Sequence, residues 1–286
     1  MISKSRLKNI KLVLFDLDGT LLNDRGEIGK ETISLVGQLE QLGVHFSFAS
    51  GRLHSALTDY ATQLNIKAPI ISLDGSYLKS YPEGKVLFQS AIPKKKVKQA
   101  IEFADQFLLK IALCHADAIY YTEHNSVIPE IIDKFGAAFE EVHSYDAYLD
   151  ETLEIVFASD MRANLKFVRS RLSFPYSFGL NANYYKSHLR DSIYYLDIRK
   201  SGSTKATGLK NLLKYLGLRI SDAAVLGDWY NDSTLFETKA LKIAVANAVP
   251  EIKFKADYEL KGTNNEDGTA EFLEMVLKAK KSKPYV

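Results

Sequence analysis

The sequence predicts an α/β fold in which a doubly wound parallel sheet is split by an inserted α+β domain. Short apolar runs alternate with amphipathic helical segments near both ends of the 286-residue chain. This alternation favours parallel strands with helices on both faces. It stops after Gly75 and resumes after Lys200. The intervening stretch is too long for a loop, so we expect it to form a second domain over residues 83–190, between core segments 1–82 and 191–286.

The first core segment contains three apolar strands separated by two helices. The first helix places Leu35, Leu39 and Leu42 on one face and ends at Gly43, as the 3.6-residue period and the preference of glycine for helix ends predict. Short links between these elements fit the crossover connections of a parallel sheet. The expected elements are strands at 11–15, 44–50 and 69–75 and helices at 30–43 and 53–64.

The insert and the second core segment have different patterns. The insert mixes strands and helices without regular alternation, whereas the second core segment returns to strand and helix in turn. In the insert we expect a hairpin around 82–84, a helix from 94, strands near 111–121, a helix at 129–135, a strand at 153–159, a helix near 164–172 and aromatic strands up to 198. After it we expect helices at 205–217, 231–239 and 267–281 and strands at 223–228 and 242–247.

Composition and charge narrow the class of protein. The hydrophobic content of 46% and charged content of 25% are ordinary for a globular protein, and the net charge of +2 gives no reason to expect nucleic acid or an anionic membrane as a partner. Cys114 is the single cysteine, which fits a reducing compartment. Because no signal-peptide or membrane-spanning run is visible, we expect a soluble cytoplasmic protein. The sequence leaves the oligomeric state open.

Polar residues follow four of the predicted core strands. Because the carboxyl ends of parallel strands meet at one edge, these residues should converge where ligands bind in such sheets. Several carboxylates around a small site favour Mg²⁺, which prefers oxygen ligands. A hydroxyl and a lysine ammonium can hold a phosphoryl group beside the cation. The residues are Asp16 and Asp18, then Ser50, Gly51 and Arg52, then Asp74 and Gly75, then Asp228, Asn231 and Asp232, with Lys205 at a helix start.

Each of these features also has a simpler interpretation. Two aspartates around one residue commonly serve a turn, and the Asn231-Asp232 pair commonly caps a helix. Ser50 could begin a helix, Lys205 could be a surface lysine, and Asp74 could belong only to a turn. The coincidence of such signals at four strand ends favours a ligand site.

The motifs resemble those of a known superfamily. The stretches "FDLDGTLL", "ASGR", "SGSTKATGL" and "GDWYND" are similar, in this order, to the four motifs of the haloacid dehalogenase superfamily. The stretches "VANAVPEIKFKADY" and "TNNEDGTAEFL" resemble its Cof-type branch with a type IIB cap. The resemblance runs from Asp16 to Gly268. It implies a Rossmann-like core and a Mg²⁺-dependent phosphatase whose insert is a cap that selects the substrate.

The resemblance also implies catalytic and metal-binding roles. Asp16 would attack phosphorus and become an aspartyl phosphate. Asp18 would protonate the leaving oxygen and then activate water. Mg²⁺ would be held by Asp16, the backbone carbonyl of Asp18 and Asp228, with Asp232 close behind. A carboxylate can serve as a nucleophile in this way.

The phosphoryl oxygens would be bound by a second set of residues. The resemblance implies Ser50, Gly51, Lys205 and Asn231 for this role. One departure from the family pattern lies here, because Asp74 stands where an asparagine is common and adds a negative charge near a phosphate. A second is the pair Trp229 and Tyr230 inside "GDWYND", which could line the pocket mouth or pack against the next helix.

These observations predict a phosphatase for a small phosphomonoester of the sugar phosphate, nucleotide or pyridoxal phosphate type. A phosphomutase or phosphotransferase would use the same nucleophile, and a non-catalytic Mg²⁺ or phosphate-binding module is a third possibility. Asp18 favours hydrolysis because it can activate water. The substrate cannot be read from the sequence. The cap side chains that could select it have no motif behind them: His115, Tyr121, Tyr184, Tyr185, His188 and Arg190.

Overall fold

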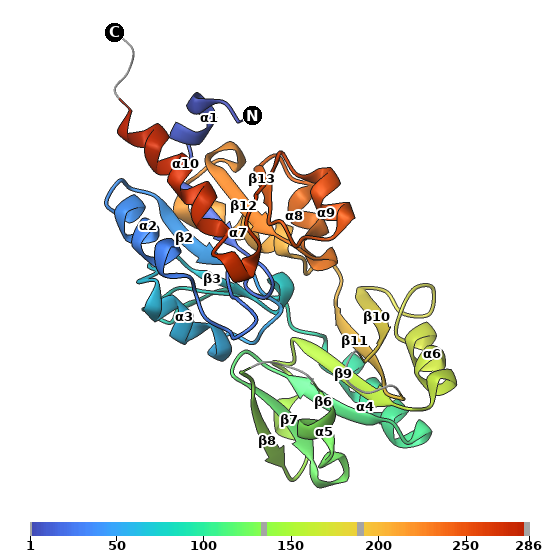
Figure 1. Ribbon diagram of the computed structural model, residues 1–286. Coiled ribbons are helices and arrows are strands. Elements are labelled where there is room, and N and C mark those ends of the chain that lie inside the picture. The colour runs from blue at the N-terminus through green and yellow to red at the C-terminus, as the bar shows by residue number, and fades with distance from the viewer. Residues whose placement is uncertain (1, 133–135, 188–191, 283–286) are drawn as a thin grey trace. The chain divides into compact units, whose positions relative to one another are not determined.

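The computed structural model describes residues 2–132, 136–187 and 192–282. The chain divides into two compact units (Figure 1), which we call the core unit and the insert unit. The core unit comprises residues 1–51, 57–87 and 204–286, and the insert unit comprises residues 52–56 and 88–203.

The core unit is built on a five-stranded parallel sheet with the order β14-β13-β12-β1-β2. From β1 the chain moves to β2 on one side, and after the insert it moves from β12 outward on the other. The order therefore reverses between β1 and β12, which confirms the doubly wound topology expected from the sequence. The strands are β1 (Leu12–Phe15), β2 (His45–Phe48), β12 (Ala223–Gly227), β13 (Leu241–Ala244) and β14 (Tyr258–Glu259).

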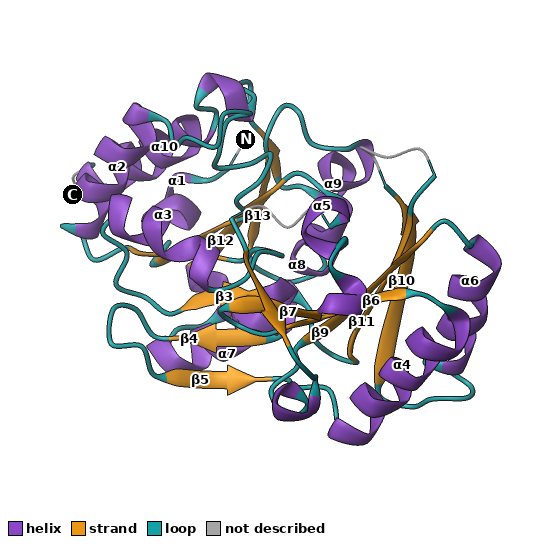
Figure 2. Cartoon of the chain, turned by 90° about the horizontal axis from the view of Figure 1, so that it is seen from below, coloured by secondary structure: helices purple, strands orange, loops and turns teal. Residues whose placement is uncertain are grey.

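A small second sheet continues the core beside β2. A parallel bridge between Ala49 and Ile71 places β3 next to the end of β2. Strands β3, β4 and β5 form one three-stranded sheet, which is visible in Figure 2. Their bounds are Ile70–Ser72, Tyr77–Lys79 and Val86–Gln89.

Helices of the core unit pack in two groups. Helix α10 packs against α1 and α2, and α2 and α10 lie side by side in Figure 1, whereas α7 packs against α8 and the β3–β4 region. All four residues of β1 are fully buried, as expected for a strand covered on both faces. The helices are α1 (Lys4–Lys8), α2 (Lys30–Glu40), α3 (Thr58–Gln63), α7 (Lys205–Leu216), α8 (Ser233–Phe236), α9 (Pro250–Lys255) and α10 (Thr269–Lys281).

One detail of the helix prediction was wrong. Leu35 and Leu39 are buried as expected, but Leu42 is 45% exposed. The reason is that α2 ends at Glu40, and the chain turns through Gly43 in the left-handed conformation before β2. Leu42 therefore lies on this turn and not on the buried face of the helix.

The insert unit contains a six-stranded sheet with the order β10-β11-β9-β6-β7-β8. Its pairs are antiparallel except β7–β8, which is parallel. Helices α4 and α6 pack on this sheet over an apolar cluster that includes Val97, Phe157 and Leu165. The elements are α4 (Lys94–Phe107), β6 (Lys110–Cys114), β7 (Ala118–Thr122), α5 (Ile128–Ile131), β8 (Ala138–Val142), β9 (Glu154–Ser159), α6 (Arg162–Arg171), β10 (Leu180–Lys186) and β11 (Tyr194–Lys200).

The insert unit differs in its limits from residues 83–190. Strand β11 pairs with both β9 and β10, so the chain stays in the insert unit until Ser203. The short segment 52–56 also belongs to it, because the N–H of Ser55 donates to the carbonyl of Ala116 at 3.2 Å. The helix expected at 129–135 is present only as the single turn α5, which ends at Ile131 because Ile132 has an extended backbone, and residues 133–135 lie outside the described residues.

None of the helices in residues 2–132, 136–187 and 192–282 is long and apolar enough to span a lipid bilayer.

A glycine holds the β3–α7 junction together, and its replacement tests this packing. Gly75 has φ +95°, and a Cβ there would lie 2.0 Å from the carbonyl oxygen of Thr204. We expect Gly75→Ala to lower the free energy of unfolding by about 3 kcal/mol or more, because the backbone cannot move aside without displacing α7. Gly43→Ala is the matched control, since Gly43 has φ +76° and open space around it. Its cost should be about 1 kcal/mol. Equal losses in urea titrations would contradict the close packing.

Candidate active site

The site begins at the carboxyl ends of β1 and β12, the strands between which the order reverses. Asp16 follows β1, and its N–H donates to the carbonyl of Leu226 in β12 at 2.9 Å. Asp228 follows β12 directly. The two aspartates therefore leave adjacent parallel strands at the same edge. Carboxylate oxygens of Asp16, Asp228 and Asp232 lie within 4.8 Å of one another, and all three residues are buried.

Asp232 joins this group from a short 3₁₀ turn, Tyr230–Asp232. Its Oδ2 accepts hydrogen bonds from the backbone N–H groups of Asp228 at 3.0 Å and Trp229 at 3.2 Å. A Cβ at Gly227 would lie 2.5 Å from the same oxygen, so the absence of a side chain at this position lets Asp232 fold back over the strand end. The "GDWYND" motif is thus a compact turn that places two carboxylates side by side.

Lys205 is the first residue of α7 and reaches into the acidic group. Thr204 caps the helix by accepting from the N–H of Thr207 at 3.2 Å. The Lys205 Nζ lies 2.6 Å from Asp16 Oδ1 and 2.7 Å from Asp232 Oδ1, and the side chain is fully buried. Burial alone would lower the pKa of Lys205, but the carboxylates of Asp16, Asp232 and Asp74 outweigh it and raise the pKa. Lys205 is therefore an ammonium.

Two of the clustered carboxyl groups have raised pKa values. Burial and then the charge of Asp232 raise the pKa of Asp16 well above its usual range. Burial also raises the pKa of Asp228 to about 6, although Thr20 Oγ1 donates to Asp228 Oδ1 at 2.8 Å. Burial is the larger cause of these shifts, and repulsion from the neighbouring carboxylates adds to it. A divalent cation would relieve this repulsion.

The donor set fits a hard cation. The three clustered side chains offer carboxylate oxygens, which suit Mg²⁺. Gly19 has φ +78°, and a Cβ there would lie 2.4 Å from Asp228 Oδ2, so the turn after Asp18 leaves room for that oxygen. The side chain of Asp18 is exposed and lies outside the group of three. Its assignment as a metal ligand concerns the backbone carbonyl and stays a prediction.

Of the residues expected to hold phosphate, Ser50 and Gly51 follow β2, Asn231 lies in the turn after β12, and Lys205 begins α7. Ser50 is buried, and its N–H donates to the carbonyl of Ile71 at 3.1 Å. Gly51 follows it, and the carbonyl of Ser50 accepts from the N–H of Asp74 at 2.9 Å. Asn231 is exposed, and its Nδ2 donates to Asp74 Oδ1 at 3.3 Å. The core unit thus brings Ser50, Asp74 and Asn231 together.

Two supporting residues were not identified from the sequence. Thr20 orients Asp228 through the hydrogen bond given above. Asn247 follows β13, and its Nδ2 donates to the carbonyl of Gly19 at 2.7 Å, which fixes the turn after Asp18. The position of Thr20 directly after Asp18-Gly19 was a usable signal. Asn247 lies in the stretch "VANAVPEIKFKADY" that resembles the Cof-type branch, but the resemblance gave it no role, and an asparagine after a strand is common in turns.

The side chains proposed as substrate selectors have varied surroundings in the insert unit. His115 is buried, and its Nε2 lies 2.9 Å from the carbonyl of Tyr148. This contact gives His115 a structural role. Tyr184 stacks on Tyr194 with ring centroids 5.7 Å apart at the edge of the apolar cluster. Tyr185 donates to Asp197 Oδ2 at 3.0 Å, and Tyr121 is partly exposed. His188 and Arg190 lie outside the described residues.

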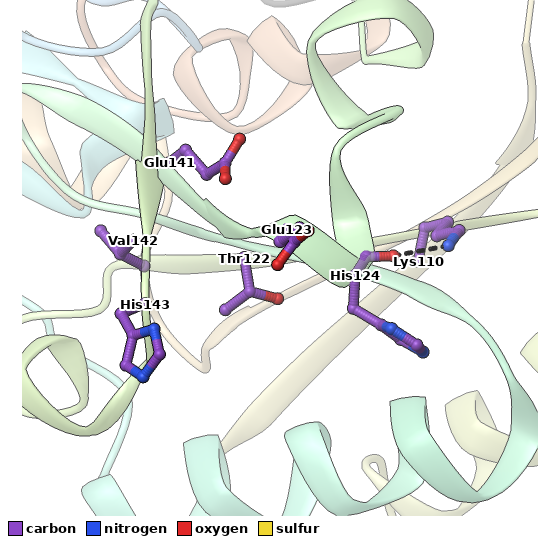
Figure 3. A pocket seen from close by; sticks show the side chains of 7 residues that line it. All are labelled: Lys110, Thr122, Glu123, His124, Glu141, Val142 and His143. Carbon is purple, nitrogen blue, oxygen red and sulfur yellow. Dashed lines mark hydrogen bonds between the residues drawn. The ribbon is translucent and has the colours of Figure 1, made fainter.

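The insert unit also has a polar pocket of its own, with a volume of about 910 Å³. Figure 3 shows its side chains, and Lys110 Nζ donates to the carbonyl of His124 at 2.7 Å. The motif residues of the core do not line it. Its lining residues are Lys110, Thr122, Glu123, His124, Glu141, Val142 and His143.

Comparison with known proteins settles the family. A family model described as haloacid dehalogenase-like hydrolase matches residues 13–273. The chain belongs to this family. Members generally use a metal ion, which agrees with the buried acidic group of this hydrolase. The match confirms the resemblance inferred from the four motifs.

Related proteins align with nearly the whole length of this hydrolase. A Bacillus subtilis protein named 5-amino-6-(5-phospho-D-ribitylamino)uracil phosphatase YitU is 27% identical over 92% of this chain and 96% of its own length. Phosphatase YwpJ from the same organism is 24% identical over 94% of this chain and 100% of its own length. A haloacid dehalogenase-like hydrolase from Bacteroides thetaiotaomicron has the same fold, with a TM-score of 0.81, 24% identity and coverage of 93% of this chain and 99% of that one.

The raised pKa of Asp228 predicts a gain in stability when its charge is removed. The folded protein holds the Asp228 proton up to about pH 6, against about 3.8 for an ordinary aspartate. The free energy of unfolding of the metal-free protein should therefore fall as pH rises through this window. In chelator at pH 7.5, Asp228→Asn should be more stable than the parent by about 2 kcal/mol, and at pH 4 the gain should be small.

Asp222→Asn is the control for this prediction, because it should change the free energy of unfolding in the opposite direction. Hydrogen bonding to Arg219 lowers the pKa of Asp222, and its Oδ2 accepts from the N–H of Arg219 at 3.0 Å. Its replacement should therefore reduce stability at pH 7.5. Thermal unfolding at the two pH values provides the measurement. A loss of stability in Asp228→Asn at pH 7.5 would contradict the conclusion that the buried charge of Asp228 is unfavourable in the metal-free protein.

Proposed function

We propose that the chain hydrolyses a small phosphomonoester through an aspartyl phosphate on Asp16. The observation that carries this proposal is the buried contact of Asp16 with Lys205 inside a group of three carboxylates. A buried carboxylate at the switch point of a parallel sheet, with an ammonium fixed beside it, is arranged to meet a phosphoryl group. The family match and the phosphatase names of the relatives support the same conclusion.

The reaction proceeds in two displacements on phosphorus. In the first, an Asp16 carboxylate oxygen forms a bond to phosphorus as the bond to the ester oxygen breaks, and Asp18 gives its proton to the departing alcohol. In the second, Asp18 takes a proton from water, whose oxygen attacks phosphorus and releases Asp16 and inorganic phosphate. The proton that Asp18 gives up in the first displacement is replaced by the one it takes from water in the second, so each turnover leaves Asp18 as it began.

Charge is the main obstacle to these steps, because an anion must approach an anion. Lys205 holds its positive charge beside Asp16, and Ser50 and Asn231 offer hydrogen-bond donors to the phosphoryl oxygens. Mg²⁺ bound by Asp16, Asp228 and the backbone carbonyl of Asp18, with Asp232 close behind, would supply further positive charge at the phosphoryl group. Asp16 must therefore bind the cation and serve as the nucleophile.

A phosphotransferase or phosphomutase is the second candidate. It would form the same aspartyl phosphate and pass it to a sugar hydroxyl. Asp18 favours hydrolysis, because it stands next to the nucleophile in the turn and can activate water. The test is to measure inorganic phosphate released from sugar phosphates, nucleotides and pyridoxal phosphate, with and without added sugar acceptors. Release that requires an acceptor would favour transfer, and the absence of release from every ester would defeat the proposal.

The insert unit is the proposed cap that selects the leaving group. All residues assigned to the chemistry lie outside residues 88–203: Asp16, Asp18, Ser50, Gly51, Lys205, Asp228, Asn231 and Asp232. We therefore expect substitution of residues 88–203 by a Gly/Ser linker to leave cleavage of p-nitrophenyl phosphate within about tenfold of the parent, while the ranking among natural esters is lost. Circular dichroism must show a folded core. A folded, Mg²⁺-binding core that fails to cleave the activated ester would mean that the insert supplies a catalytic group.

A further inference from the structure

Asp74 lies at the phosphoryl end of the proposed site and has a fixed position there. Its N–H donates to the carbonyl of Ser50, and its Oδ1 accepts from Asn231 at 3.3 Å. A Cβ added at Gly51 would lie 3.3 Å from Asp74 Oδ2. The next residue, Gly75, packs against Thr204, which directly precedes Lys205, the first residue of α7. Asp74 is thus surrounded by residues that we assign to phosphate binding.

The leaving group must depart through the exposed side of the core site. Phosphoryl transfer runs in line, so the leaving oxygen departs on the side opposite Asp16. Asp16, Ser50 and Lys205 are buried, whereas Asp74 is partly exposed and Asn231 is exposed. The exposed side of the core site contains the Asp74–Asn231 pair and also Asp18, which the proposed mechanism places at the leaving oxygen, so a leaving group on this side can reach Asp74.

A carboxylate at this position is unfavourable for an ordinary phosphate ester. Lys205 already contacts Asp16 and Asp232, and Asp74 brings a third carboxylate whose charge acts on the same ammonium. A neutral leaving group gains nothing from this charge, and the phosphoryl group is repelled by it. A leaving group with a positive charge would be attracted.

We propose that Asp74 recognises an ammonium group on the leaving group of the substrate, close to the phosphoryl group. This inference rests on the proposed phosphatase function and narrows its substrate class to amino-bearing phosphate esters. The hydrogen bond from Asn231 orients the carboxylate, and its position beside Gly51 keeps it close to the phosphoryl site. Asp74 is a specificity residue in this scheme, and the reacting atoms do not include it.

Asn is a suitable replacement for testing the charge of Asp74. Asp74 has φ 48° and ψ 37°, a left-handed conformation that Asn adopts as readily as Asp. Asp74→Asn therefore keeps the turn and removes the charge. If Asp74 only holds the turn and Asn231, this variant should bind charged and neutral ligands in the parent's proportion.

The experiment compares two phosphonates of equal length that cannot be hydrolysed. 2-Aminoethylphosphonate carries the ammonium, and propylphosphonate replaces it with a methyl group. Binding to the full chain is measured by calorimetry with Mg²⁺ present. We expect the parent to bind the amino compound about fivefold to tenfold more tightly, and we expect this ratio to fall to within about twofold of one in Asp74→Asn. Asp24→Asn, in an exposed turn, should keep the parent's ratio.

Two results overturn the inference: a ratio near one in the parent, or an unchanged ratio in Asp74→Asn. The first needs no variant, so the inference can be tested even if Asp74→Asn does not fold. Turnover of p-nitrophenyl phosphate by the parent is measured separately. A parent that cleaves this ester but binds both phosphonates equally refutes the ammonium recognition alone, whereas a parent that cleaves no ester refutes the phosphatase function.

Discussion

Replacement of Asp16 by Asn is expected to reduce turnover of p-nitrophenyl phosphate by at least about a thousandfold. An amide is a poor nucleophile toward phosphorus and a weaker ligand for a cation. The fold should persist, because burial and the neighbouring Asp232 already raise the pKa of the Asp16 carboxyl, so a neutral side chain of the same shape suits the pocket. The measurement combines steady-state kinetics with thermal unfolding.

Two further variants make this result specific. Asp16→Ala excludes activity that returns when Asn deamidates to Asp, and it should be as inactive as Asp16→Asn. Asp24→Asn removes a carboxylate from an exposed turn and should keep the parent's rate. Retention of more than a few per cent of activity in a folded Asp16→Ala protein would falsify the nucleophile assignment, and the acidic group would then serve only to bind a cation.

The fold could be predicted where local pattern and tertiary environment agree. The strand expected at residues 11–15 is confirmed as β1, Leu12–Phe15, whose four residues are all apolar because both faces of the sheet are covered. Strand β8 was not expected, since most of its side chains are exposed and give no apolar signal. Strand β14 has two residues, too few for a periodic pattern. The expected insert limit at residue 190 cut through the aromatic strands expected up to 198, because the pairing of β11 with β9 and β10 is not visible in a single sequence.

The convergence of the aspartates in the candidate site could be predicted from the sequence, but the contacts of Lys205 could not. Parallel strands must bring Asp16 and Asp228 to one edge, and the structure places their carboxylates together. The sequence could not show that Lys205 bridges Asp16 and Asp232, because that contact depends on how closely Gly75 approaches Thr204. Packing of this kind arises between segments far apart in the chain.

Removal of divalent metal is expected to abolish turnover, and added Mg²⁺ is expected to restore it. At pH 7.5 the carboxyl of Asp228, with a pKa raised to about 6, is mostly ionised and repels Asp16 and Asp232. A cation converts this repulsion into binding energy. Activity in EDTA should therefore fall by at least about a hundredfold. At a Mg²⁺ concentration about 100 times Kd, the melting temperature of the metal-free protein should rise by about 5 °C.

Asp228→Asn separates binding of the cation from general effects of salt. This variant lacks one carboxylate of the group but keeps Asp16, Asp232 and Lys205 in place. Its melting temperature should respond little to Mg²⁺, whereas the parent's should rise, and its activity should not return. Ca²⁺ serves as a second probe, because its larger size suits a site with more ligands, so it should stabilise the parent less than Mg²⁺ does. Full activity of the parent in metal-free buffer would mean that Lys205 alone neutralises the phosphoryl group, and the three carboxylates would then need another explanation.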